Sequence, residues 1–322
     1  MAEKQPQPTE PPKTISLPSI LPLRWTTTHT ITPTSIITYN LALSAPATHL
    51  PHVYEGHPQF QPLPTYAAVF CIQAMGQVHN AMHTFLPNFK AHNHVHGEHW
   101  LELHRSYPTS GKVVTTARVL DVVAQKRGVL VAVEVVTRLA GADGAEGEKI
   151  CTQEWTSFVL QVPGVGANTA LKERGPRTQR HTIPSDRQPD ATREYVATAE
   201  QGALYRAASG DLNPLHIDPE TASRAGFRAP IMTGTCTIGV GVRLVMEVMG
   251  QGKNFESVKC RLSRPVFAGD RVRVEMWRVE DGLVVYRMVV DEEDEKGGMR
   301  QRVVIDGAGL RFVGGDVGGA KL

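Results

Sequence analysis

The sequence predicts an α+β fold made of two similar units, each a helix followed by about four antiparallel strands. A helical segment near residues 65–85 precedes one series of strand-like segments, and a second near residues 230–249 precedes another. Between the two series lies a stretch rich in Gly, Pro, Arg and Thr without periodicity, which is typical of a connection between units. A single helix before a run of antiparallel strands usually lies across the concave face of the sheet.

The first unit is predicted to span residues 24–162. Residues 1 to about 23 are rich in proline and are expected to form a disordered or surface-wrapping arm. The chain becomes periodic from Trp25, and a helix is expected from about Thr65 to Phe85, between Pro64 and Pro87. Strands are expected at His99–His104, Lys112–Val123, Val129–Leu139 and Ile150–Val162.

A linker over residues 163–189 and a second unit over residues 190–314 follow. Helical turns are expected around Pro219–Ala225 and a longer helix from about Pro230 to Met249. This helix contains three glycines near its start, and each costs about 1 kcal/mol in a helix interior. They indicate close approach of the helix to a sheet or ligand, or tight packing alone. Strands are expected at Ser257–Arg261, Arg271–Val279, Leu283–Asp291 and Arg300–Phe312.

Composition and missing motifs exclude several classes of function. The 34 basic and 32 acidic side chains nearly cancel, so charge gives no reason to expect a nucleic-acid partner. No apolar run approaches the length of a membrane span. The chain has no Gly-x-Gly-x-x-Gly, Walker or Gly-x-Ser-x-Gly motif, so hydride transfer, nucleotide hydrolysis and serine hydrolysis lack their usual support.

The segment Gly210-Asp-Leu-Asn-Pro-Leu-His216 carries the clearest chemistry. Pro214 disfavours a continuous helix, so a turn can present Asp211, Asn213 and His216 to one cleft. A carboxylate and an imidazole that face one space can hold a water and exchange protons with a substrate. The Asn213 amide can orient a carbonyl or that water. Alternatively, Asp211 and Asn213 cap the helix near Pro219 or form an Asx turn.

A second polar segment, His92-Asn-His-Val-His96-Gly-Glu-His99, superficially resembles the ligands of a dinuclear metal site. No second set of Asp or His residues with suitable spacing accompanies it. We therefore expect no catalytic metal.

Motifs in both halves resemble the MaoC-like (R)-specific enoyl-CoA hydratases, which include the hydratase unit of the peroxisomal multifunctional β-oxidation enzyme. The main motif is Tyr205-Arg-x-x-Ser-Gly-Asp-x-Asn-Pro-Leu-His216-x-Asp218-Pro219. The likeness continues in Arg261-x-x-x-Pro265-Val-Phe-Ala-Gly269-Asp, and in the first half in Val53-Tyr-Glu-Gly-His-Pro58-x-Phe60 and His96-Gly-Glu98. Together the motifs cover most of residues 25–313.

The resemblance implies a double hot-dog fold, in which each unit wraps an antiparallel sheet around a long helix. It implies that the second unit is catalytic and that the first accommodates a bulky acyl chain. Asp211 and His216 match the family's acid/base pair, and Asn213 matches its accompanying amide. Gly234 matches the glycine whose backbone N–H polarises the thioester carbonyl. The family usually has His-Gly at this turn, whereas this chain has Thr233-Gly234.

The implied reaction is addition of water to a trans-2-enoyl-CoA to give the (3R)-hydroxyacyl-CoA, or the reverse dehydration. Both β-oxidation and biosynthesis of a specialised acyl compound fit. No cofactor is expected, because coenzyme A is part of the acyl-CoA substrate. The alternatives are a hot-dog acyl-CoA thioesterase and a catalytically altered acyl-binding partner. A homodimer is left open.

The final residues, 315–322, form a glycine-rich tail that closes with Ala320-Lys321-Leu322. A small residue, a basic residue and Leu fit the Ser-Lys-Leu type of peroxisomal address, which an import receptor reads as a free C-terminal tripeptide. We therefore expect a peroxisomal location and an import receptor as partner.

Overall fold

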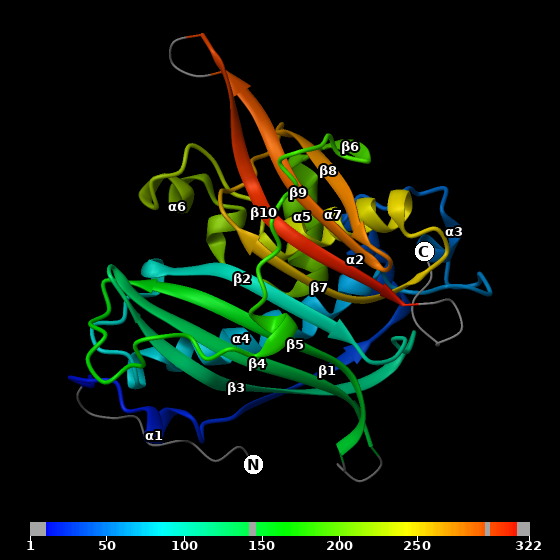
Figure 1. The fold of residues 1–322 in the computed structure, drawn as a ribbon. Coiled ribbons are helices and arrows are strands. Elements are labelled where there is room, and N and C mark those ends of the chain that lie inside the picture. Colours follow the sequence, from blue (N-terminus) through cyan, green and yellow to red (C-terminus); the bar gives the residue numbers. More distant parts are fainter. Residues whose placement is uncertain (1–10, 142–145, 294–296, 314–322) are drawn as a thin grey trace.

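The computed structural model describes residues 11–141, 146–293 and 297–313 (Figure 1). The tail over residues 315–322, with Ala320-Lys321-Leu322, lies outside the described residues. Within the described part of the chain, no helix is long and apolar enough to span a membrane.

The two units repeat one order of elements: a strand, helices, and four strands. The first unit contains β1 (Trp25–Ile31), α2 (Pro33–Ala42), α3 (Leu50–Val53), α4 (Ala67–Ala81), β2 (His94–Leu103), β3 (Gly111–Gln125), β4 (Gly128–Ala140) and β5 (Glu146–Leu160). The second contains β6 (Ala191–Val196), α5 (Ala199–Ser209), α6 (Pro219–Arg224), α7 (Gly234–Met249), β7 (Asn254–Leu262), β8 (Arg271–Glu280), β9 (Leu283–Glu293) and β10 (Met299–Val313).

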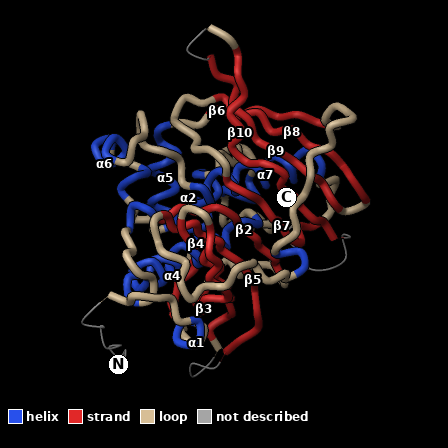
Figure 2. The backbone as a smooth tube through the Cα atoms, turned by 60° about the vertical axis from the view of Figure 1, so that its left-hand side comes forward, coloured by secondary structure: helices blue, strands red, loops and turns tan. Residues whose placement is uncertain are grey.

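All the strands join into one antiparallel sheet in the order β1-β3-β4-β5-β2-β7-β10-β9-β8-β6. The two halves meet where β2 pairs with β7, with Glu98 opposite Arg261. Helix α4 packs on the first half of the sheet and α7 on the second (Figures 1 and 2). The predicted double hot-dog fold is therefore confirmed, with the two sheets fused edge to edge.

Close packing accounts for the glycines of α7. A β-carbon at Gly241 would lie 2.7 Å from Met288 Sδ, on β9, and one at Gly239 would lie 2.7 Å from Leu43, which follows α2. Side chains at these positions would collide with the core. Glycine lowers the stability of the helix itself, but it lets α7 pack closely against the sheet and α2, which offsets that loss.

The packed helices α2 and α5 show how the units correspond. Tyr39 and Tyr205 stand at matching positions, with ring centroids 5.8 Å apart. Each helix is followed by a residue in the left-handed region, Ser44 in the first unit (φ +59°) and Gly210 in the second (φ +70°). The next residue is Ala45 in the first unit but Asp211 in the second. The first unit thus lacks a carboxylate at the matching position.

The N-terminal arm corrects one expectation, because residues 11–23 are not disordered. They contain a short helix, α1 (Leu17–Ile20), and bury Ile15 and Ile20 against the first unit. The Ile15 N–H donates to the Val165 carbonyl, 2.8 Å away. Apolar side chains between the prolines anchor this segment, so it wraps the surface.

Five other elements differ from the expectation. The expected helix at residues 65–85 consists of α4 between two 3₁₀ turns, Pro64–Tyr66 and Met82–Thr84. The sequence reading did not place the edge strands β1 and β6. It also missed α2 and α5, whose N-caps Thr32 and Thr198 each accept the backbone N–H of the third residue of the helix.

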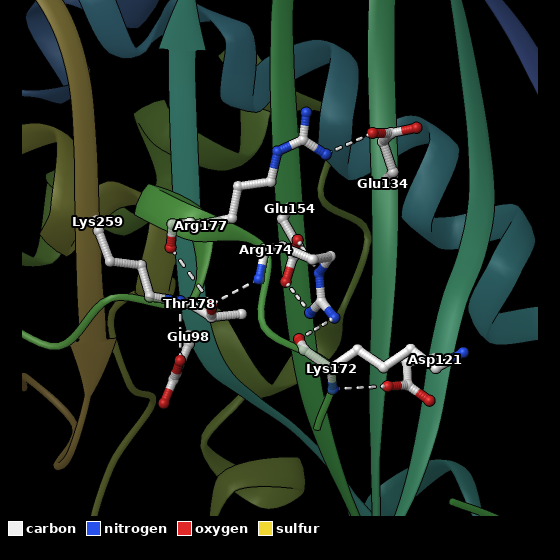
Figure 3. Close-up of polar contacts among 10 residues, drawn as sticks. Glu98, Asp121, Glu134, Glu154, Lys172, Arg174, Arg177, Thr178 and Lys259 are labelled. Atoms are coloured by element: carbon white, nitrogen blue, oxygen red, sulfur yellow. Dashed lines mark hydrogen bonds and ion pairs between the residues drawn. The ribbon is translucent and has the colours of Figure 1, made fainter. Parts of the chain in front are cut away.

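The linker over residues 163–189 crosses the outer face of the sheet (Figure 3). Arg174 forms a two-pronged ion pair with Glu154 on β5, at 2.6 and 2.9 Å. Arg177 pairs with Glu134 on β4 at 2.5 Å. Glu154 is only 1% exposed, so the linker neutralises carboxylates that it also covers.

Candidate active site

The turn after α5 is fixed by short-range hydrogen bonds. The Asp211 N–H donates to Ser209 Oγ at 3.2 Å, and the Asn213 N–H donates to Asp211 Oδ1 at 3.0 Å. The Asn213 side-chain oxygen accepts the Leu215 N–H at 3.1 Å and so caps the 3₁₀ turn Pro214–His216. The Asx-turn interpretation of Asp211 and Asn213 is therefore correct, but a different residue, Asp218, caps α6.

These bonds leave Asp211 and His216 facing each other. Asp211 Oδ2 lies 3.7 Å from His216 Nε2, and the two side chains are 17% and 12% exposed. His216 Nδ1 lies 2.8 Å from the Ile231 carbonyl oxygen. A carbonyl can only accept, so Nδ1–H donates to it, and Nε2 is the ring nitrogen on the Asp211 side. At 3.7 Å the pair is too far apart for a direct hydrogen bond, and one water can contact both groups.

The segment that holds His216 leads directly into α7. Ile231 is three residues before Gly234, which begins α7 with Thr233 as its N-cap. The Tyr205 hydroxyl donates to Thr235 Oγ1 at 2.9 Å, which ties α5 to the first turn of α7. Backbone N–H groups in the first turn of a helix have no partner within the helix and lie at the positive end of its dipole. Gly234 can therefore donate to a developing negative charge.

Comparisons with known proteins decide the family. The family described as "MaoC like domain" matches residues 181–297, and "MFE-2 hydratase 2 N-terminal domain" matches residues 29–161. The "Probable enoyl-CoA hydratase 2" of Dictyostelium discoideum is 30% identical over 80% of this chain and 85% of its own. The chain belongs to the MaoC-like dehydratase family. Another member, "3-hydroxyacyl-thioester dehydratase Y" of Mycobacterium tuberculosis, is 36% identical over 79% of this chain and 83% of its own.

Solved structures agree with this MaoC-like assignment. A MaoC-like dehydratase from Phytophthora capsici has a TM-score of 0.77 and 25% identity, with 93% of this chain and 98% of that chain covered. The full-length peroxisomal multifunctional enzyme type 2 from Drosophila melanogaster has a TM-score of 0.72 and 29% identity. There the match covers 90% of this chain and 48% of that chain.

The first unit of this MaoC-like chain reaches the site at two points. Gln73, on α4, has its Nε2 3.7 Å from the position of a β-carbon at Gly210, and the same nitrogen lies 3.0 Å from His29 Nδ1. His96, on β2, has its Nδ1 3.6 Å from the position of a β-carbon at Gly234. The site therefore lies between the units.

The environment of His96 keeps its imidazole neutral. The ring stacks on Trp155 with centroids 3.4 Å apart and planes 9° apart, and Nε2 donates to the Glu98 carbonyl at 3.2 Å. Burial lowers the pKa of His96 well below its usual range, and the nearby His99 and His94 lower it further. A neutral ring with Nε2–H leaves Nδ1 as an acceptor beside the start of α7.

The other residues of the His-rich segment make separate contacts. His94 Nε2 lies 2.6 Å from Ser157 Oγ, and His99 Nε2 lies 3.1 Å from Gln153 Oε1. His92 is exposed. Among the residues that the structure describes, no three His, Cys, Asp or Glu side chains gather as a group that could hold a metal.

Gln73 and His29 are site residues that the sequence reading missed. No motif marks them, because their position depends on the contact between α4 of one unit and α5 of the other. The sequence reading included His96 only as part of the motif His96-Gly-Glu98, without a place beside Gly234.

Proposed function

We propose that this MaoC-like chain adds water reversibly to the 2,3-double bond of a trans-2-enoyl-CoA, giving the (3R)-hydroxyacyl-CoA. The observation that carries the proposal is the pair Asp211 and His216, 3.7 Å apart, held by Ile231 within three residues of Gly234. The chain is a hydro-lyase, as the names of its enoyl-CoA hydratase and dehydratase relatives indicate.

In this proposal one water lies between Asp211 and His216. As its oxygen bonds to C3 of the enoyl group, the pair takes one of its protons and delivers a proton to C2. The thioester oxygen gains negative charge during the addition, and the Gly234 N–H donates to it. No proton is gained or lost overall, and the reverse sequence expels water. The reaction needs no cofactor, and the relative free energies of the two acyl-CoAs set its direction.

The acyl chain would extend toward the first unit. Gln73 lies across from the Asp211 turn, so α4 forms a wall of the space in which the substrate's C2 and C3 would lie. The first unit has Ala45 where the second has Asp211, which supports a role in accommodating the substrate without a second set of reacting groups. Chain length and pathway do not follow from these contacts.

Peroxisomal location is also part of the proposal. Several relatives carry peroxisomal names, among them the multifunctional enzyme type 2 of Drosophila melanogaster and the hydratase-dehydrogenase-epimerase of Neurospora crassa. Removal of Ala320-Lys321-Leu322 from a fluorescently tagged chain should change a punctate distribution to a diffuse one. An unchanged punctate distribution would show that another signal directs the protein.

Hydration of a panel of trans-2-enoyl-CoAs by the purified chain, with the products separated by chirality, tests the proposed function. We expect loss of enoyl thioester absorbance and formation of the (3R)-hydroxyacyl-CoA. A purely (3S) product would contradict the proposed stereochemistry. Release of free coenzyme A without a hydroxyacyl product would identify a thioesterase instead.

A further inference from the structure

One face of α5 supports the turn that carries Asp211 and His216. Gly202, Arg206 and Ser209 follow one another at intervals of four and three residues, so they lie on the same side of the helix. A β-carbon at Gly202 would lie 3.3 Å from the His216 carbonyl oxygen, and Ser209 Oγ accepts the Asp211 N–H at 3.2 Å. The helix therefore contacts the turn at both of its ends.

Arg206 binds the middle of the turn from the same face of α5. Its Nη1 donates to the Asp211 carbonyl oxygen at 2.9 Å and to the Asn213 carbonyl oxygen at a longer 3.5 Å. Its guanidinium group forms no ion pair with any residue that the structure describes. The contacts of this side chain are therefore directed at the turn and not at a neighbouring carboxylate.

Packing contributes little to holding the middle of the turn. Leu212, Asn213 and Pro214 are all exposed, and Leu212 is 74% exposed. The nitrogen of Pro214 has no hydrogen to donate, which removes one backbone contact that could otherwise fix the chain here. The shape of this part of the turn therefore depends on its remaining hydrogen bonds, and Arg206 supplies those that join α5 to its carbonyl groups.

The two contacts of Arg206 influence where the Asp211 carboxylate lies. Between the two carbonyl groups that Arg206 binds is the peptide that carries the Asn213 N–H, and this N–H donates to Asp211 Oδ1 at 3.0 Å. With Oδ1 held in this way, Asp211 Oδ2 lies 3.7 Å from His216 Nε2. A rotation of that peptide would move the N–H, and the carboxylate would lose the contact that directs it toward His216.

We propose that Arg206 is a positioning residue for the acid/base pair. It fixes the peptides on either side of the Asn213 N–H, and so keeps Asp211 and His216 at a separation that one water can bridge. Arg206 acts through Asp211 and not through a contact with the substrate. This inference rests on the proposed function, because it takes Asp211 and His216 to be the reacting groups.

Arg206→Gln, Arg206→Lys and a control variant test this role on crotonyl-CoA. For Arg206→Gln we expect kcat to fall about 10–100-fold, because a misaligned group reacts more slowly, with KM changed less than about threefold. Arg206→Lys should recover most of this loss, because one guanidinium nitrogen makes both contacts and an ammonium group can replace it. Arg224→Gln is the matched control, since Arg224 is 69% exposed and pairs with Glu220 on its own helix, α6. It should leave both constants unchanged.

A double-mutant cycle with Asp211→Asn shows whether Arg206 acts through this carboxylate. In the Asp211→Asn background, Arg206→Gln should lower kcat by less than about a further twofold, because the group that Arg206 positions no longer reacts. Losses that multiply would overturn the positioning role. Single-turnover measurements at high enzyme concentration give the rates of the slow variants, and melting temperatures establish that each variant is folded.

Backbone order parameters from ¹⁵N relaxation separate this inference from the proposed function, because they need no turnover. For Leu212 and Asn213 we expect values of about 0.85 in wild type and below about 0.6 in Arg206→Gln. If wild type hydrates no enoyl-CoA, the proposed function fails, while a loosened turn in Arg206→Gln would still support the hold of Arg206 on the turn. Unchanged order parameters would overturn the inference, as would a wild-type kcat in Arg206→Gln. A rise in KM alone would also overturn it, because Arg206 would then bind the substrate.

Discussion

His96 of the first unit places its Nδ1 3.6 Å from the position that a β-carbon would occupy at Gly234 of the second unit. The start of α7 is thus enclosed by Leu262 on its own unit and by a neutral, stacked imidazole from the other. The first unit therefore forms part of the boundary around the proposed thioester site, in addition to any contact with the acyl chain.

Two roles of Gly234 can be tested separately: its N–H as the donor to the thioester oxygen, and its lack of a side chain beside Leu262. Gly234→Ala keeps the N–H but directs a methyl group at Leu262, so we expect kcat on crotonyl-CoA to fall about tenfold, or ~1.4 kcal/mol. Adding Leu262→Ala should restore most of that loss. Gly234→Pro removes the N–H, and we expect a loss of about 10²–10³ that Leu262→Ala does not restore.

Steady-state kinetics, with melting temperatures as a check on folding, measure these effects, and Leu262→Ala alone is the control. A Gly234→Pro protein that folds normally and keeps more than about a tenth of wild-type kcat would exclude this N–H as the main donor to the oxyanion.

Gln73 tests the role of α4 beside the substrate. Gln73→Trp should lower kcat/KM on trans-2-decenoyl-CoA at least about tenfold more than on crotonyl-CoA, because a larger side chain narrows the space beyond the reacting carbons. Gly76→Ala, on the exposed face of the same helix where a β-carbon meets nothing within 4 Å, is the control. Equal losses on both substrates would mean that Gln73 supports the turn and does not limit chain length.

The ion pair under the linker should contribute to stability. Arg174→Ala leaves Glu154, 1% exposed, without its partner, so we expect a loss of about 3 kcal/mol in the free energy of unfolding. Arg174→Ala with Glu154→Gln should recover part of this loss. Arg105→Ala breaks an exposed pair with Glu148 and should cost less than about 0.5 kcal/mol. Urea unfolding measures all three, and similar small losses would show that the linker is not anchored by this pair.

The buried position of His94 predicts that the free energy of unfolding decreases as the pH falls. Burial, and then the neighbouring His79, lower the pKa of His94 from 6.5 to about 3. At a pH between these two pKa values, His94 binds a proton in the unfolded chain but not in the folded chain. The contribution of the neutral His94 side chain to the free energy of unfolding is therefore complete above about pH 6.5. As the pH falls toward 3, this contribution is lost at up to about 1.4 kcal/mol per pH unit.

The measurement compares urea unfolding of wild type and His94→Gln from pH 7 to pH 5. Other groups titrate in both proteins, so the difference between the two curves isolates His94. We expect the difference to shift in favour of the variant by about 1 kcal/mol per pH unit below pH 6.5. Parallel curves would show that His94 is not a buried neutral imidazole.

The features that could be predicted from the sequence are those that depend on residues within a few positions of one another. The turn between Asp211 and His216 was predictable because Pro214 restricts the backbone within a few residues of both, whereas their roles as an acid/base pair came from the family resemblance. The core strands were predictable because their apolar residues alternate or run continuously. Helix α5 was harder to predict, because much of it is polar and only some of its side chains are buried.

Contacts between the units were not predictable, because they join residues far apart in the chain. The pairing of β2 with β7 and the contact of Gln73 with the turn at Gly210 both depend on how the units pack. The arm was predicted partly as disordered because of its prolines. Burial of Ile15 and Ile20 against the first unit outweighs that tendency.

The central claim is that Asp211 and His216 act together as the acid/base pair. The most direct test is the kcat of Asp211→Asn and His216→Ala on crotonyl-CoA, with melting temperatures to establish folding. We predict that each variant folds normally and loses about 10²–10⁴ in kcat, the range for positioned acid–base groups. Near-wild-type turnover by either variant would contradict the account.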